Sequence, residues 1–121
     1  MRRALICDDD ETFRDFVSRV LKLSGWEVRQ AEHGDAALGW VDREPPFDLV
    51  MVDLLMPVRS GWEVIEFLRR ASGYENTRII AVTGLAPSAD EWARLKQRHV
   101  EILTKDGDFT VERLLQMINT P

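Results

Sequence analysis

The sequence predicts an α/β fold in which a five-stranded parallel sheet carries helices on both faces. Strand patterns and helix patterns alternate five times along the 121 residues, and short connections join them. Most of the strand candidates are continuous apolar runs, as expected for parallel strands buried on both faces. Crossovers between such strands are right-handed and place their helices against the sheet.

The first half of the chain contains three strand patterns and two helix patterns. The strand Arg3–Cys7 is followed by a helix with one apolar face, which Gly25 terminates. That face comprises Phe13, Phe16, Val17, Val20 and Leu21. Residues 26–31 form a more polar strand, expected at an edge of the sheet, and residues 35–44 form a helix that Pro45 and Pro46 end. An apolar third strand covers residues 48–53.

The second half repeats the strand and helix alternation. After the loop at residues 56–61, a helix places Trp62, Ile65 and Leu68 on one side. The strand Arg78–Thr83, a helix at 88–98, the strand Val100–Thr104 and a helix at 110–119 follow. The apolar residues of the helix at 88–98 are Ala89, Trp92, Ala93 and Leu95. The four tryptophans are expected to pack in the core or against helices, and His33 and His99 are expected to be solvated.

Composition indicates one soluble domain over residues 1–121. A chain of 14.0 kDa can bury a core without metal or disulfide support. The single cysteine, Cys7, excludes a disulfide framework. No apolar stretch is long enough to span a bilayer and the N-terminus lacks a signal-peptide pattern, so we expect a cytoplasmic protein. The formal net charge of -5 argues against nucleic acid as a direct partner.

Four of the five strands end on groups that bind metals or phosphoryl oxygens. Asp8 and Asp9 follow the first strand, Asp53 ends the third, Thr83 ends the fourth, and Lys105 follows the fifth. The carboxyl ends of parallel strands meet at one edge of the sheet, where ligands bind in open α/β folds. These five side chains are therefore expected to share one pocket.

This set of residues suits phosphoryl transfer to a carboxylate. Asp53 can attack a phosphoryl group if the negative charges of both groups are neutralised. A carboxylate pair beside a third aspartate suits Mg²⁺, and we therefore expect Asp8 and Asp9 to bind that cation. Thr83 can donate a hydrogen bond to a phosphoryl oxygen, and Lys105 can pair with one. By contrast, Asp10 and Glu11 are interpreted as acids that favour a helix N-terminus.

The ordered motifs resemble the receiver domain of two-component response regulators over essentially the whole chain. The motifs are Cys7-Asp8-Asp9, Asp53-Leu54-Leu55-Met56-Pro57, Ser60-Gly61, Val82-Thr83-Gly84 and Lys105. The resemblance implies a flavodoxin-like doubly wound sheet of strand order 2-1-3-4-5. It also implies a signalling phosphoacceptor, not an enzyme that turns over, with transfer from a histidine kinase or histidine phosphotransfer protein to Asp53.

The resemblance further implies a role for each site residue. Asp9, Asp53 and the backbone carbonyl of Leu55 would bind Mg²⁺ directly, with Asp8 in the outer shell of the metal. Thr83 and Lys105 would hold the phosphoryl oxygens. The surface formed by the helix at 88–98, the strand Val100–Thr104 and the helix at 110–119 would contact a downstream effector protein or domain.

The sequence departs from the family pattern at two positions. The family usually has a proline after the lysine, joined by a cis peptide, whereas Asp106 follows Lys105 here. A cis bond is unfavourable before other residues, so the resemblance does not fix the geometry of this loop. The family also commonly has an aromatic ring three positions before the lysine, and this chain has Ile102. The usual route from the threonine to the output surface is therefore absent.

Two other functions are compatible with parts of the sequence. The run Asp8-Asp9-Asp10-Glu11-Thr12, with Gly107-Asp108 later, resembles the motifs of haloacid-dehalogenase-like phosphatases, in which Asp8 would be the nucleophile. That alternative leaves Asp53 unexplained. A pseudo-receiver, which keeps the fold as a binding module without phosphorylation, is favoured by the altered Lys105-Asp106 junction and opposed by the intact set of site residues.

Overall fold

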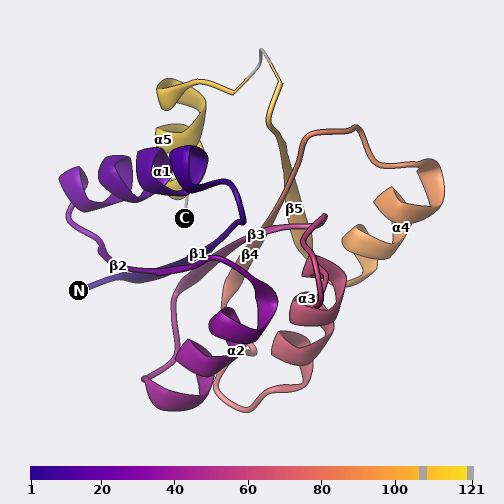
Figure 1. The fold of residues 1–121 in the computed structure, drawn as a ribbon, viewed down its shortest axis with the longest axis horizontal. Coiled ribbons are helices and arrows are strands. Elements are labelled where there is room, and N and C mark those ends of the chain that lie inside the picture. The colour runs from indigo at the N-terminus through magenta and orange to yellow at the C-terminus, as the bar shows by residue number, and fades with distance from the viewer. Residues whose placement is uncertain (107–108, 120–121) are drawn as a thin grey trace.

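The five strands form one parallel sheet of order β2-β1-β3-β4-β5, as predicted. A computed structural model describes residues 1–106 and 109–119. The strands are β1 (Arg3–Cys7), β2 (Glu27–Ala31), β3 (Leu49–Asp53), β4 (Arg78–Thr83) and β5 (Val100–Thr104). The helices are α1 (Glu11–Leu23), α2 (Gly34–Arg43), α3 (Gly61–Arg70), α4 (Ala89–Gln97) and α5 (Val111–Asn119). Each predicted element is present, and the predicted ends differ from the observed ones by at most one residue (Figure 1).

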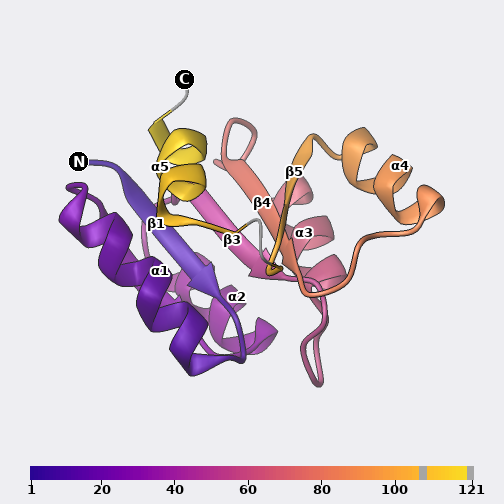
Figure 2. The same ribbon diagram turned by 90° about the horizontal axis from the view of Figure 1, so that it is seen from above.

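Helices cover both faces of the sheet and create two separate apolar cores (Figure 2). Side chains alternate between the faces of a strand, so in β1 Leu5 and Cys7 enter one core while Ala4 and Ile6 enter the other. The first core is closed by buried residues of α2, α3 and α4, and the second by buried residues of α1 and α5. The central strands are buried on both sides, which explains their continuous apolar sequence.

The prediction that Gly25 ends the first helix is confirmed. Gly25 has φ of 91°, and the Trp26 amide donates to the Leu21 carbonyl at 3.0 Å. This left-handed residue closes the helix and turns the chain into β2. β2 lies at the edge of the sheet, as its polar sequence suggested.

Three predictions about helix faces and histidines were wrong. In α4 only Leu95 is buried among the expected apolar residues, and Trp92 is 46% exposed, because this helix packs at the margin of the sheet (Figure 1). Phe16 of α1 is 41% exposed. His33 is half-buried: its Nδ1 accepts the Ala36 amide at 3.0 Å and caps α2. His99 is exposed, as expected.

A glycine lets α3 start directly against the end of β3. A Cβ on Gly61 would lie 2.1 Å from the Asp53 carbonyl oxygen, so a side chain there has no room. In the preceding loop Val58 is 93% exposed and has φ of 68°, a conformation that is unfavourable for a β-branched residue. The loop after Asp53 therefore combines close packing with local strain.

Candidate functional site

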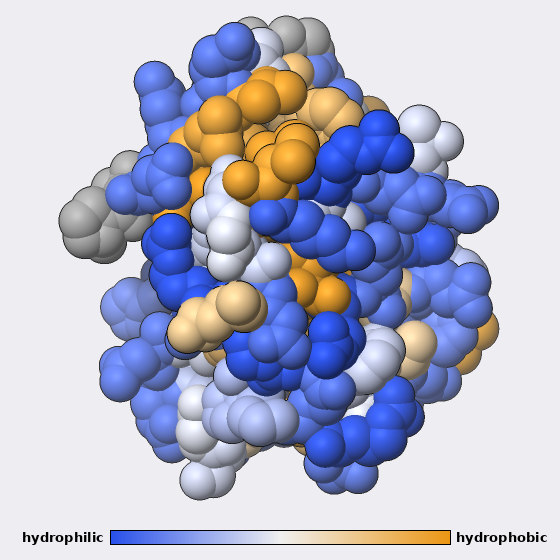
Figure 3. Space-filling model, turned by 90° about the vertical axis from the view of Figure 1, so that its left-hand side faces the viewer, coloured by the Kyte–Doolittle hydropathy of each residue, from blue (hydrophilic) through white to orange (hydrophobic). Residues whose placement is uncertain are grey.

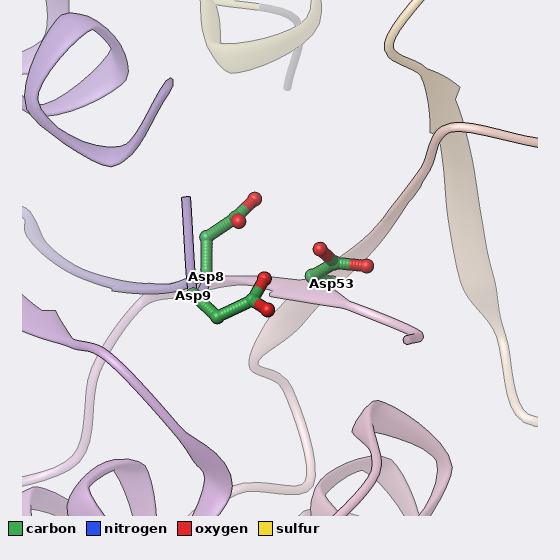
Figure 4. A group of neighbouring side chains, drawn as sticks. All are labelled: Asp8, Asp9 and Asp53. Atoms are coloured by element: carbon green, nitrogen blue, oxygen red, sulfur yellow. The ribbon is translucent and has the colours of Figure 1, made fainter. Parts of the chain in front are cut away.

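Three aspartates meet at the carboxyl edge of the sheet (Figure 4). β1 and β3 are neighbours, with Cys7 paired to Val52, so Asp8 and Asp53 leave adjacent strands at the same level. One carboxylate oxygen each of Asp8, Asp9 and Asp53 lies within 4.8 Å of the others. Asp8 and Asp53 are buried and Asp9 is exposed, which leaves the cluster open on one side.

Lys105 joins this cluster from the edge strand β5. Its backbone amide donates to the Thr83 carbonyl at 2.8 Å, which fixes the start of the loop. Its Nζ lies 2.7 Å from Asp8 Oδ2 and 3.2 Å from Asp53 Oδ2. Every peptide bond in the described part of the chain is trans, including Lys105–Asp106. The non-proline junction therefore still delivers the ammonium group to the two carboxylates.

The charges of Asp8, Asp53 and Lys105 influence one another strongly because these side chains are largely buried. Burial raises the pKa of the Asp8 carboxyl, and this effect exceeds the lowering by Lys105 and by the Asp10 amide. Burial acts to lower the pKa of Lys105, but its contacts with Asp8 and Asp53 outweigh that effect and raise the pKa. The ammonium group thus stays charged between two carboxylates.

The donor set fits a hard divalent cation. Three carboxylates converge, and the buried Asp8 Oδ2 has no well-directed hydrogen bond, although it lies at ion-pair distance from Lys105. Asp8 Oδ1 accepts the Asp10 amide at 2.9 Å, and Asp53 Oδ1 accepts the Leu55 amide at 2.9 Å, so both carboxylates are held in place. Oxygen ligands of this kind are preferred by Mg²⁺ and Ca²⁺.

Thr83 lies near the site but is engaged elsewhere. Its buried hydroxyl donates to the Leu85 carbonyl at 2.8 Å and accepts the Leu85 amide at 3.2 Å. Both bonds would have to yield for this hydroxyl to reach a phosphoryl oxygen. Leu55 follows Asp53 with its side chain 63% exposed.

Asp53 is enclosed at the carboxyl edge of the sheet, since it is only 6% exposed. Burial of the carboxylate next to Lys105 and Asp8 strengthens the electrostatic coupling among them.

Two residues at this site were missed by the sequence analysis. Arg14 Nη1 donates to the Asp8 carbonyl at 2.7 Å and stabilises the turn between β1 and α1. The ring of Phe13 lies 4.6 Å from Lys105 Nζ. Both lie in the first turns of α1, and nothing in the sequence pattern indicated that either side chain contacts the site.

Cys7 lies directly before the aspartates and is a core residue, as expected. It is buried, and burial raises the pKa of its thiol to about 12, with Asp8 and Asp53 adding to the effect. A thiol of this kind is a poor nucleophile near neutral pH.

The chain matches the response regulator receiver domain family over residues 4–119. Among curated proteins it resembles the DNA-binding dual master transcriptional regulator RpaA of Synechocystis. The two are 32% identical over 118 residues, which are 98% of this chain and 48% of RpaA. The chain therefore spans about half the length of that relative.

Two solved structures that agree with this chain in fold contain bound ions or a modified residue. A Burkholderia pseudomallei response regulator with a phosphorylated aspartic acid, calcium ion and citrate is 30% identical with a TM-score of 0.83, covering 99% of this chain and 68% of that one. The response regulator TrrA of Thermotoga maritima in complex with Mg²⁺-BeF is 28% identical with a TM-score of 0.78, covering 98% and 96%.

Within residues 1–106 and 109–119, no helix combines the length and apolar character that crossing a bilayer requires.

Proposed function

The chain belongs to the response regulator receiver domain family, and from this premise we propose that Asp53 is its phosphoacceptor and that phosphorylation depends on Mg²⁺. The observation that carries the proposal is the buried Asp53 carboxylate, 3.2 Å from Lys105 Nζ and clustered with Asp8 and Asp9. A receiver is a signalling phosphoacceptor, so phosphorylation changes its state and does not release a product at each cycle.

The reaction forms an acyl phosphate. An oxygen of Asp53 attacks phosphorus, its electron pair forms the new P–O bond, and the bond between phosphorus and the donor breaks with its electrons leaving on the donor. Asp9, Asp53 and the Leu55 carbonyl would hold Mg²⁺, with Asp8 in its outer shell. When bound, this cation neutralises charge on the phosphoryl oxygens. Lys105 pairs with a phosphoryl oxygen, and the Thr83 hydroxyl, once freed from Leu85, donates to another.

The partners follow from the same proposal. We assign residues 1–121 to one receiver domain that works in the cytoplasm and takes its phosphoryl group from a histidine kinase or a histidine phosphotransfer protein. The surface of α4, β5 and α5 would then bind an effector protein or domain. The relative RpaA is about twice as long as this chain, and its DNA-binding activity is not transferred here, since the formal charge of -5 disfavours nucleic acid.

The two alternatives have less support. The phosphatase alternative makes Asp8 the nucleophile, but the chain matches the receiver family across residues 4–119. The Gly107-Asp108 loop on which that alternative also rests lies outside the described residues. The pseudo-receiver alternative was based on the Lys105-Asp106 junction, yet Lys105 still reaches both Asp8 and Asp53.

Intact mass measurement after incubation with acetyl phosphate tests the proposal. The wild type is expected to gain the mass of one phosphoryl group with Mg²⁺ and none with excess chelator. Asp53→Asn should gain none under either condition. Asp48→Asn, which changes an aspartate outside the site directly before β3, should behave as the wild type.

The result that would overturn the proposal is a phosphoryl group that persists in Asp53→Asn. Phosphorylation of Asp8, or hydrolysis of a phosphomonoester that Asp8→Asn abolishes, would instead establish the phosphatase. Absence of modification in the wild type, with a folded protein and active donor, would favour the pseudo-receiver.

A further inference from the structure

The cation of the site contacts an aromatic ring as well as carboxylates. Lys105 Nζ lies 4.6 Å from the centroid of Phe13 on the first turn of α1. This distance is within the range of a cation–π interaction, in which the negative face of the ring attracts the ammonium group. The side chain of Lys105 is only 18% exposed, so water screens the interaction weakly.

A second ring holds Phe13 in place. Phe109 packs against Phe13 with ring centroids 5.1 Å apart and an interplanar angle of 55°, and against Phe16 at 6.0 Å in an edge arrangement. These tilted and edge geometries are the favourable ones for aromatic pairs. Figure 3 shows that apolar residues gather on the upper part of the side of the molecule it presents, over α1 and α5. The two ends of the loop after β5, Lys105 and Phe109, thus both contact Phe13.

We propose that Phe13 is a positioning residue for Lys105, whose ammonium group it holds beside the phosphorylation site. The inference rests on the proposed function of Asp53. Phe13 acts through Lys105 and has no contact of its own with the phosphoryl group.

The charges at the site explain why such a residue is useful. The two carboxylates that bind Lys105, Asp8 and Asp53, also belong to the acidic cluster, so a metal ion bound in the cluster competes with Lys105 for the same two carboxylates. Formation of an acyl phosphate also removes the carboxylate charge of Asp53 itself. The attraction of a ring for an ammonium group does not depend on either change. Phe13 can therefore retain Lys105 while its ionic partners are being exchanged.

Graded fluorination of Phe13 separates this attraction from simple packing. Each added fluorine withdraws electron density from the face of the ring and changes its volume little, so affinity for the cation falls stepwise. The experiment compares Phe13 with its mono-, di- and trifluorinated forms, together with Phe13→Leu and Phe13→Trp. The same replacements at Phe16 are the matched control, because Phe16 shares the contact with Phe109 and has none with Lys105.

The first measurement is the affinity for beryllium fluoride at saturating Mg²⁺. We expect Phe13→Leu to bind about 2- to 30-fold more weakly, the range of a partly desolvated cation–π contact. Phe13→Trp should retain the wild-type affinity, and the fluorinated series should fall in order. Equal affinities across that series, or an equal loss at Phe16, would overturn the proposal.

The second measurement needs no phosphoryl analogue. The ring current of Phe13 should shift the Cε protons of Lys105 upfield in the NMR spectrum of the free protein, and Phe13→Leu should abolish this shift. The shift should persist when Mg²⁺ is added, and its loss on Mg²⁺ addition would contradict the retention of Lys105. If wild-type protein binds no beryllium fluoride, the proposed function fails, and the ring-current shift still decides whether Phe13 holds Lys105.

Discussion

At the scale of single residues, two exposed leucines lie beside the candidate site, one two positions after Asp53 and one two positions after Thr83. Leu55 is 63% exposed and Leu85 is 71% exposed, and both line a cavity of about 180 Å³ that also contacts Thr83. Neither side chain can hydrogen-bond to a water molecule and orient it toward phosphorus. Hydrolysis of the acyl phosphate needs such a water in line with the bond that breaks, so this chain should retain its phosphoryl group for long.

We expect the double variant Leu55→Asn with Leu85→Glu to lose its phosphoryl group roughly 10-fold faster than the wild type, a difference of about 1.4 kcal/mol in activation free energy. The measurement is the first-order loss of phosphate from purified protein at saturating Mg²⁺. Leu23→Asn, at an exposed leucine in the last turn of α1, is the control and should leave the rate unchanged. An unchanged or slower rate in the double variant would show that these leucines do not shield the phosphorus.

A second residue, Tyr74, links the stability of the fold to alkaline pH. It is the single tyrosine of the chain and is 3% exposed, and burial raises the pKa of its hydroxyl above the usual 10.0. The folded state therefore keeps the proton to a higher pH than the unfolded state does. The stability that this provides is complete below pH 10 and is lost as pH rises through the folded pKa.

We expect the tyrosinate absorbance of the folded protein to titrate above pH 10, and the midpoint to return to 10.0 in denaturant. Tyr74→Phe should remove this part of the alkaline destabilisation. At neutral pH it should cost about 1 kcal/mol, because the hydroxyl accepts the Phe47 amide. Titration of the folded protein at the ordinary value would mean that the hydroxyl is accessible to water.

At the scale of elements, the junction between β3 and α3 determines where Asp53 lies. The Gly61 amide donates to the Leu54 carbonyl at 3.2 Å, and the backbones approach so closely that a Cβ would collide with the Asp53 carbonyl. Ser60 and Glu63 form a capping box that starts α3 at this point. The start of α3 and the backbone of Asp53 are thus packed together as one unit.

Gly61→Ala should therefore lower the free energy of unfolding by about 2–3 kcal/mol, the cost of overpacking, and should displace Asp53. Gly39→Ala in α2 is the matched control, because there a Cβ meets only the end of the Arg43 side chain, at 3.1 Å. That change should stabilise the helix by about 0.5–1 kcal/mol. Urea unfolding of both variants measures whether the free energy of unfolding falls in one and rises in the other. Equal changes in the two variants would contradict the close approach at Gly61.

At the scale of the whole molecule, we expect signal transmission to use the loop after β4. Ile102 is half-buried in β5 and packs against the core beneath α2, α3 and α4, so no ring is present there to swing inward. The hydroxyl of Thr83 is bonded to both the amide and the carbonyl of Leu85. Release of these bonds by a phosphoryl oxygen would free the loop and shift an existing two-state equilibrium.

We expect amide chemical shifts to change most over residues 83–89 when beryllium fluoride and Mg²⁺ are added to the protein. Thr83→Ala should abolish these changes, since it removes the group that exchanges partners. Large changes confined to β5 would contradict a loop-based route.

Sequence patterns predicted the fold well because strand ends and apolar periodicity are local properties. Asp8, Asp53 and Lys105 converge because the carboxyl ends of parallel strands meet, a rule that needs no coordinates. The contact between Phe13 and Lys105 could not be predicted, since it depends on the rotation of α1 and the path of the loop after Lys105. The exposure of Trp92 was missed for a related reason: the margin of the sheet leaves most of α4 without a surface to cover.

The strand order also determines how readily the strands that carry the carboxylates, and the strand that carries the lysine, open locally in solution. Asp8 follows β1 and Asp53 ends β3, and both strands have neighbours on both sides, whereas Lys105 follows β5 at the edge of the sheet. Amides of central strands usually exchange with solvent deuterium only on global unfolding, and edge elements exchange through smaller openings. The free energy of opening measured by amide exchange should therefore approach the full free energy of unfolding in β1 and β3. In β5 it should be well below that value. The strands that carry the carboxylates then open only when the whole protein unfolds, while the strand that leads to Lys105 opens more often.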